Sequence, residues 1–262
     1  MPAELSPVPQ DKAAPHRRIR VEILLVLGLS LGASAVYSVV AILARLTQKT
    51  PLSSQTATLN NSLSNRPGFD LTYQLLSVLF DLVPVALAAF LLWRVTRPHL
   101  SRLGIDGSRP WRDALAGLAL AVVIGVPGLA LYLLGHAIGI TVRVQPNALD
   151  TYWWTIPVLL LSALRAGVVE EVLVVGYLFA RLGDLGWRKW PIILTSAVLR
   201  GSYHLYQGFG SFVGNVAMGV LFGWLYTKYG RVLPLVVAHF LLDAVSFVGY
   251  QWAVAALPAL FA

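Results

Sequence analysis

Residues 152–180 read "YWWTIPVLLLSALRAGVVEEVLVVGYLFA", a long apolar run that contains three charged side chains, Arg165, Glu170 and Glu171. About 20 helical residues are enough to cross the hydrocarbon core of a bilayer, so a run of this length predicts a transmembrane helix. Two adjacent carboxylates in such a helix are costly unless they face other polar groups. The run therefore predicts both a membrane-spanning fold and a polar site inside it.

The remainder of the chain has the same apolar character. It is 57% hydrophobic and only 12% charged, whereas a soluble domain carries about 25% charged residues. Its mean hydropathy is +0.70. We therefore predict an all-α fold, a polytopic helical membrane protein with seven to eight transmembrane helices. Seven helices are expected near residues 21–44, 71–93, 114–138, 152–180, 190–206, 210–227 and 232–250, and the tail at 251–262, with Pro258, is expected to form a short eighth.

Two parts of the chain differ in character. Residues 1–20 are polar and basic, and we expect them to form a disordered cytoplasmic tail. Residues 21–262 are expected to form a single transmembrane helical domain, with its motif-bearing core at 152–250. The sequence contains no cysteine, which excludes disulfides, thiolate metal sites and cysteine nucleophiles.

Lysine and arginine are distributed unevenly between the predicted loops. If the N-terminus is cytoplasmic, the inner segments are the tail, 94–113, 181–189 and 228–231, and they hold fourteen of the twenty basic residues. The outer loops hold four. This bias predicts a cytoplasmic N-terminus, in a multi-pass protein of the plasma membrane if the host is a prokaryote. The net charge of +8 then reflects topology and contact with anionic lipids, and no nucleic-acid partner is expected.

Several ionisable residues fall inside the predicted helices, where they usually face a wet cavity or mark function. At 1.5 Å per residue, Glu171, His204, His239 and Asp243 lie about 12 to 21 Å from the inner ends of three different helices. His239 and Asp243 also share one helix face, because they are four residues apart. We therefore expect one polar cluster near the middle of the membrane. Asp81 is expected only to bond a neighbouring helix, His136 to lie at the membrane interface, and the glycines at 210, 214, 219 and 223 to allow close helix packing.

Glutamate, two histidines and an aspartate are suitable for activating water. A desolvated carboxylate can act as a general base, and imidazoles can orient the water or bind a metal. The set also suits zinc, although no H-E-x-x-H motif is present.

Three motifs in order, "EEVLVVGYL" from Glu170, "RGSYH" from Arg200 and "HFLLD" from His239, resemble the CAAX-processing and bacteriocin-processing (CPBP) family of intramembrane proteases, also called Abi or Rce1-like. The resemblance covers roughly residues 152–250. It implies that Glu170 activates water beside His204, that His239 and Asp243 stabilise the transition state, and that Glu171 supports them. The family has been described both as metal-dependent and as metal-free. The implied cofactor is therefore a divalent metal such as zinc, held by Glu170, His204, His239 and Asp243, or none.

The sequence departs from the family pattern at two positions. Val175 stands where the family has arginine, and Arg200 stands where the family usually has phenylalanine, four residues before the histidine of the second motif. We interpret the two changes as one compensated exchange, in which Arg200 supplies the missing cation and pairs with Glu171.

Taken together, these features predict an intramembrane endopeptidase that uses glutamate- and histidine-activated water. Its expected partners are membrane lipids and a hydrophobic or lipidated peptide substrate, either a prenylated CAAX-type peptide or another hydrophobic one, reaching the site between helices. Two alternatives are a proton-coupled transporter and a non-catalytic scaffold or immunity-type protein. The absence of an internal repeat disfavours the first, whereas Val175 leaves the second open.

Overall fold

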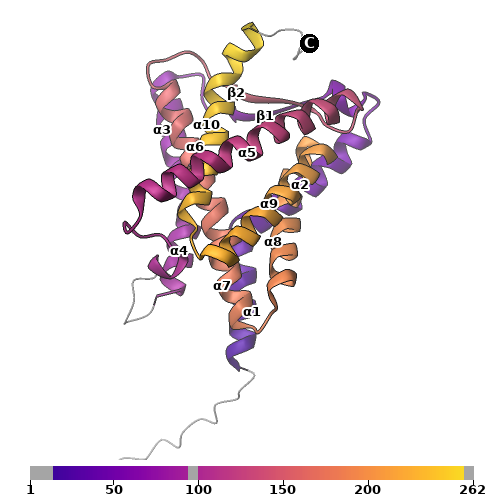
Figure 1. Ribbon diagram of the computed structural model, residues 1–262. Helices are drawn as coiled ribbons and strands as arrows, with labels where there is room; N and C mark the ends of the chain where they lie inside the picture. The colour runs from indigo at the N-terminus through magenta and orange to yellow at the C-terminus, as the bar shows by residue number, and fades with distance from the viewer. Residues whose placement is uncertain (1–13, 94–99, 257–262) are drawn as a thin grey trace, which may run out of the picture.

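The computed structural model describes residues 14–93 and 100–256, which form a predominantly helical molecule (Figure 1). Its α-helices are α1 (Ala14–Gly28), α2 (Leu31–Leu46), α3 (Pro67–Asp81), α4 (Val83–Leu91), α5 (Pro110–Ala137), α6 (Thr155–Glu170), α7 (Leu178–Asp184), α8 (Lys189–His204), α9 (Phe209–Tyr229) and α10 (Leu233–Ala256). A π-helix, η3 (Glu171–Tyr177), joins α6 to α7. Short 3₁₀ turns are η1 (Leu52–Ser54), η2 (Ser101–Leu103) and η4 (Leu205–Gln207).

The helices agree with the predicted class of membrane protein. Four segments of the described chain are long and apolar enough to cross a bilayer: Pro67–Leu91, Pro110–Ala137, Phe209–Tyr229 and Leu233–Tyr250. A fifth candidate is the pair α1 and α2, which are bent by 56° relative to each other. The predicted count of seven to eight is higher because it also includes α6–α7, which contains the π-helix, and α8, which has 16 residues.

The two ends of the chain differ from the prediction. The first predicted helix, 21–44, is a bent pair, and α1 begins at Ala14, so residues 14–20 are helical where a disordered tail was expected. At the other end α10 continues to Ala256, so residues 251–256 extend the last helix and do not start an eighth. The remaining calls on both tails, including Pro258, concern residues outside the described part of the chain.

A small parallel sheet was not predicted. Strand β1 (Thr56–Asn61) pairs with β2 (Arg143–Ala148), with Thr56 opposite Arg143. An isolated bridge between Thr141 and Gly208 continues this contact to the turn between α8 and α9. The sheet therefore connects three interhelical segments at the end of the molecule opposite α7 (Figure 1).

Close helix packing positions the central helices. Helix α6 packs against α10, and α8 packs against α9. At Gly219 a Cβ atom would lie 2.8 Å from the Cα of Ala197, and at Gly167 it would lie 3.1 Å from the carbonyl oxygen of Val236. A Cβ at Gly219 would force its neighbour to shift, and a Cβ at Gly167 would require the backbone of α10 to give by a few tenths of an ångström. The close packing expected at Gly219 is therefore confirmed, and Gly167 is a second such position that was not predicted.

The predicted inner segments meet at one end of the molecule. Arg181 of α7 bonds Glu22 of α1 at 2.6 Å. Arg102 bonds Asp184 at 3.2 Å. Arg231 bonds Asp106 at 3.1 Å, and hydrogen bonds from Ser108 and Arg231 lower the pKa of Asp106 to about 2. The segments expected on one side of the membrane thus lie together, while the side that faces the cytoplasm stays a prediction.

Candidate active site

The two adjacent glutamates lie where the backbone changes from α to π geometry. Glu170 is the last residue of α6, and Glu171 is the first of η3. π-Helical turns are rare and are frequent at functional sites. Neighbouring residues of an α-helix point about 100° apart, so we expected one carboxylate to face a cavity and the other a neighbouring helix. In the structure both carboxylates belong to one buried cluster.

Glu171 is fully buried and has two close partners. Arg200 of α8 donates from Nη2 to its Oε2 at 2.7 Å. His239 of α10 donates from Nδ1 to its Oε1 at 2.6 Å. The ion pair predicted between Arg200 and Glu171 is therefore present. Because both side chains are completely buried, each charge depends on the other for compensation.

Glu170 directs one oxygen toward four donors. Tyr203 donates its hydroxyl hydrogen to Oε2 at 2.7 Å. The same oxygen lies 3.5 Å from Nε2 of His204, 3.7 Å from Nη1 of Arg200 and 3.9 Å from Nε2 of His239. The last three distances are too long for hydrogen bonds but suit a water molecule between the groups.

Asp243 completes the cluster one helical turn beyond His239. Its Oδ2 lies 3.6 Å from Nε2 of His239. The imidazole thus has Glu171 at one nitrogen and Asp243 at the other. This arrangement fixes the ring orientation.

All six predicted site residues meet here, from four elements: Glu170, Glu171, Arg200, His204, His239 and Asp243. Their catalytic roles stay predictions. Tyr203 was missed, although a hydroxyl directly before His204 in an apolar helix was a usable signal. Ser196, one turn before Arg200, donates to the carbonyl of Val174 in the π-helix and so fixes α8 against it.

The cluster does not have the arrangement of a metal site. Among the described residues, no group of three or more histidine or carboxylate side chains is placed to hold an ion. The proposed ligands Glu170, His204, His239 and Asp243 do not converge on one point, and the guanidinium of Arg200 already faces both glutamates. The residues present therefore do not fit zinc, and we derive no step through a metal.

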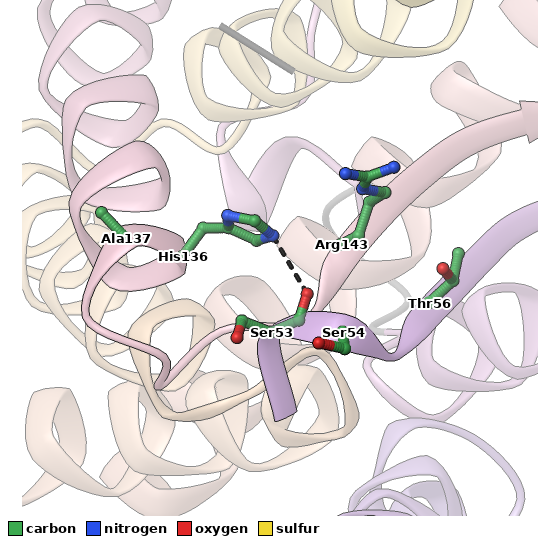
Figure 2. Close-up of a pocket in the computed structure, with 6 residues that line it drawn as sticks. All are labelled: Ser53, Ser54, Thr56, His136, Ala137 and Arg143. Atoms are coloured by element: carbon green, nitrogen blue, oxygen red, sulfur yellow. Dashed lines mark hydrogen bonds between the residues drawn. The ribbon is translucent and has the colours of Figure 1, made fainter. Parts of the chain in front are cut away.

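Two further predicted positions lie outside the cluster. Asp81 accepts a hydrogen bond from Arg165 of α6, which confirms its expected contact with a neighbouring helix. His136 donates from Nε2 to the carbonyl of Ser53 at 3.1 Å, beside a cavity of about 540 Å³ near the sheet (Figure 2). Its lining, Ser53, Ser54, Thr56, His136, Ala137 and Arg143, contains none of the predicted catalytic residues.

The apolar helices indicate an integral membrane protein, and the buried carboxylate–histidine cluster lies among them. Residues 152–245 match the family model described as type II CAAX prenyl endopeptidase Rce1-like. The matched segment contains all six site residues. It confirms the resemblance that the three motifs indicate, because this part of the chain is similar to a family of proteases. No curated protein and no solved structure matches the chain significantly.

Proposed function

We propose that the protein is an intramembrane endopeptidase in which Glu170 activates water to hydrolyse membrane-associated peptides, either prenylated CAAX-type or otherwise hydrophobic. The family match supports the class of reaction. One observation supports the residues: Nε2 of His204 is buried without a hydrogen-bond partner in the described protein and faces Glu170 Oε2 at 3.5 Å. A buried polar atom requires a partner, and a water molecule beside the two groups would supply it.

In the proposed reaction this water loses a proton to Glu170 while its oxygen attacks the carbonyl carbon of the substrate. The carbonyl becomes an oxyanion, which accepts a hydrogen bond from the cationic ring of His239. The tetrahedral intermediate then collapses, the peptide C–N bond breaks, and Glu170 returns its proton to the leaving amine. His204 orients the water throughout.

Glu171 and Arg200 act as positioning residues in this scheme. Glu171 holds Nδ1 of His239, so that Nε2 faces the reacting atoms. Arg200 compensates the charge of Glu171 at 2.7 Å. We propose that Arg200 thereby replaces the arginine that the family has at the position of Val175.

The test compares Glu170→Gln with the unaltered protein on S-farnesylated C-a-a-X peptides and hydrophobic transmembrane peptides in proteoliposomes. General bases contribute about 10²- to 10⁴-fold, so we expect a loss of that size with an unchanged melting temperature. Asp150→Asn, at an exposed carboxylate in the loop before α6, is the matched control and should keep full activity. A chelator should leave the rate unchanged.

Hydrolysis at the normal rate by Glu170→Gln would contradict the role of this residue. If the unaltered protein cleaves neither class of peptide, the endopeptidase proposal itself is wrong.

A further inference from the structure

An ion pair lies on the apolar flank of the molecule, away from the loops. Arg165 of α6 donates from Nη1 to Asp81, the last residue of α3. Asp81 lies ten residues before the end of α4, or about 15 Å, near the middle of a hydrocarbon core about 30 Å thick. The neighbouring Phe80 and Leu164 are exposed on the same flank. Charged groups at this depth are costly and are rarely kept without a function.

The helix that carries Arg165 also packs against α10, the helix of the cluster residues His239 and Asp243. Helix α6 packs against both α3 and α10 (Figure 1), and its Arg165 contacts Asp81 at the end of α3. Across the interface of α6 with α10, Oδ2 of Asp243 lies 3.6 Å from Nε2 of His239. The exposed fraction of the side chains falls from 44% at Asp81 to 29% at Arg165, 25% at Asp243 and 7% at His239. The polar side chains thus become progressively less exposed from the flank to the proposed reacting residues.

Arg165 has donors left for a ligand. Its Nε is buried and has no hydrogen-bond partner in the described part of the chain, and Asp81 engages Nη1. A guanidinium carries five N–H donors in a planar fork that binds carboxylates through two parallel bonds. The fork at this position is therefore suited to a carboxylate that approaches from the flank.

We propose that Arg165 binds the C-terminal carboxylate of the peptide substrate, which takes the place of Asp81 between α3 and α6. This subsite rests on the proposed endopeptidase function. A C-a-a-X peptide ends in a free carboxylate three residues after its prenylated cysteine, a length of about 10 Å when extended. Arg165 precedes Glu170 by five residues, or about 7.5 Å along α6, and its long side chain adds reach, so the two lengths are compatible.

Asp81 acts as an internal substitute for the substrate in this arrangement. Exchanging one carboxylate for another on the same guanidinium keeps the charge paired. An amidated peptide cannot make the exchange, because it offers no negative charge. The subsite therefore selects peptides that end near the scissile bond over internal segments of transmembrane helices.

The test measures binding without turnover, in the Glu170→Gln background, by fluorescence anisotropy in detergent micelles. Two S-farnesylated C-a-a-X peptides are compared, one with a free C-terminal carboxylate and one with a C-terminal amide. We expect about 10-fold tighter binding of the carboxylate peptide. Arg165→Gln should abolish this preference by weakening the binding of the carboxylate peptide only. Asp81→Asn should tighten the binding of the carboxylate peptide several-fold. Arg143→Gln, at the outer cavity, is the matched control and should change neither affinity.

Equal affinities for the two peptides, or an equal loss of both in Arg165→Gln, would overturn the subsite. If Arg165→Gln folds poorly, the tighter binding of the carboxylate peptide expected for Asp81→Asn still tests the subsite. Hydrolysis by the protein with intact Glu170 is measured separately. Absence of hydrolysis alongside a retained carboxylate preference contradicts the endopeptidase proposal alone, whereas equal hydrolysis of both peptides contradicts the role of Arg165 alone.

Discussion

At the scale of single residues, Arg200 is the side chain on which the cluster depends most. It lies 2.7 Å from Glu171 and 3.7 Å from Glu170, and none of its side chain is exposed. Removing one partner of a buried ion pair leaves an uncompensated charge, which costs about 3 to 5 kcal/mol. Arginine here thus stabilises the fold and keeps two neighbouring carboxylates in one site.

We expect Arg200→Ala to lower the free energy of unfolding by about 3 to 5 kcal/mol and to abolish hydrolysis. The double variant Val175→Arg/Arg200→Phe restores the family pattern and should recover part of both. Thermal unfolding in detergent and peptide hydrolysis measure the two effects. Normal behaviour of Arg200→Ala together with an inactive double variant would show that the exchange is not compensatory.

The residues of the cluster were largely predictable, whereas the backbone that presents them was not. Ionisable side chains in apolar helices are conspicuous, and the spacing of His239 and Asp243 places both on one helix face. The same reasoning overlooked Tyr203, because a tyrosine in an apolar helix is unremarkable without its partner. Packing decides which carbonyl each backbone amide bonds, so the π-helix η3 has no periodic sequence pattern that could predict it. Strands β1 and β2 were missed because they are short and polar, and so lack the alternating apolar pattern of a strand.

At the scale of elements, the distance between α6 and α10 sets the geometry of the site. Gly167 lies one turn before Glu170 and Glu171, against the backbone of α10 on both sides of His239. A Cβ there would lie 3.1 Å from the oxygen of Val236 and 3.2 Å from the nitrogen of Phe240. Both contacts involve backbone, which cannot rotate away, so the helices must separate instead.

We expect Gly167→Ala to reduce the hydrolysis rate by about 10-fold or more, since misplacement by 1 Å can cost about 10²-fold. Gly128→Ala is the matched control, because nothing lies within 4 Å of its Cβ position on α5 and alanine favours a helix. That variant should keep its activity and melt no lower than the unaltered protein. Equal rates for the two variants would show that this helix contact does not position the site.

At the scale of the whole molecule, the basic segments gather at one end and the sheet lies at the other (Figure 1). Ion pairs from Arg181, Arg102 and Arg231 connect the segments at the basic end. The positive-inside rule predicts that this end faces the cytoplasm. The site then lies between an inner end held together by charge and an outer end held together by backbone pairing.

Topology can be measured directly, because the sequence has no cysteine of its own. Asn65→Cys lies in the loop before α3 that is predicted to be outer, and Gly107→Cys lies in the loop before α5 that is predicted to be inner. A membrane-impermeant thiol reagent should label Asn65→Cys in intact cells, but Gly107→Cys only after the membrane is opened. The reverse labelling pattern would show that the orientation is opposite to the predicted one.

The sheet has a consequence for the order in which the chain assembles. Thr56 of β1 pairs with Arg143 of β2, so β1 is synthesised long before its partner strand. Helices α3, α4 and α5 lie between the two strands in the sequence and must be synthesised before the strands can pair. Closing so long a loop is entropically unfavourable until the helices have packed. Until β2 is available, water outside the bilayer can hydrogen-bond the backbone N–H and C=O groups of β1, which the hydrocarbon core could not do. We therefore expect the pairing of β1 with β2 to follow the packing of the helices between them.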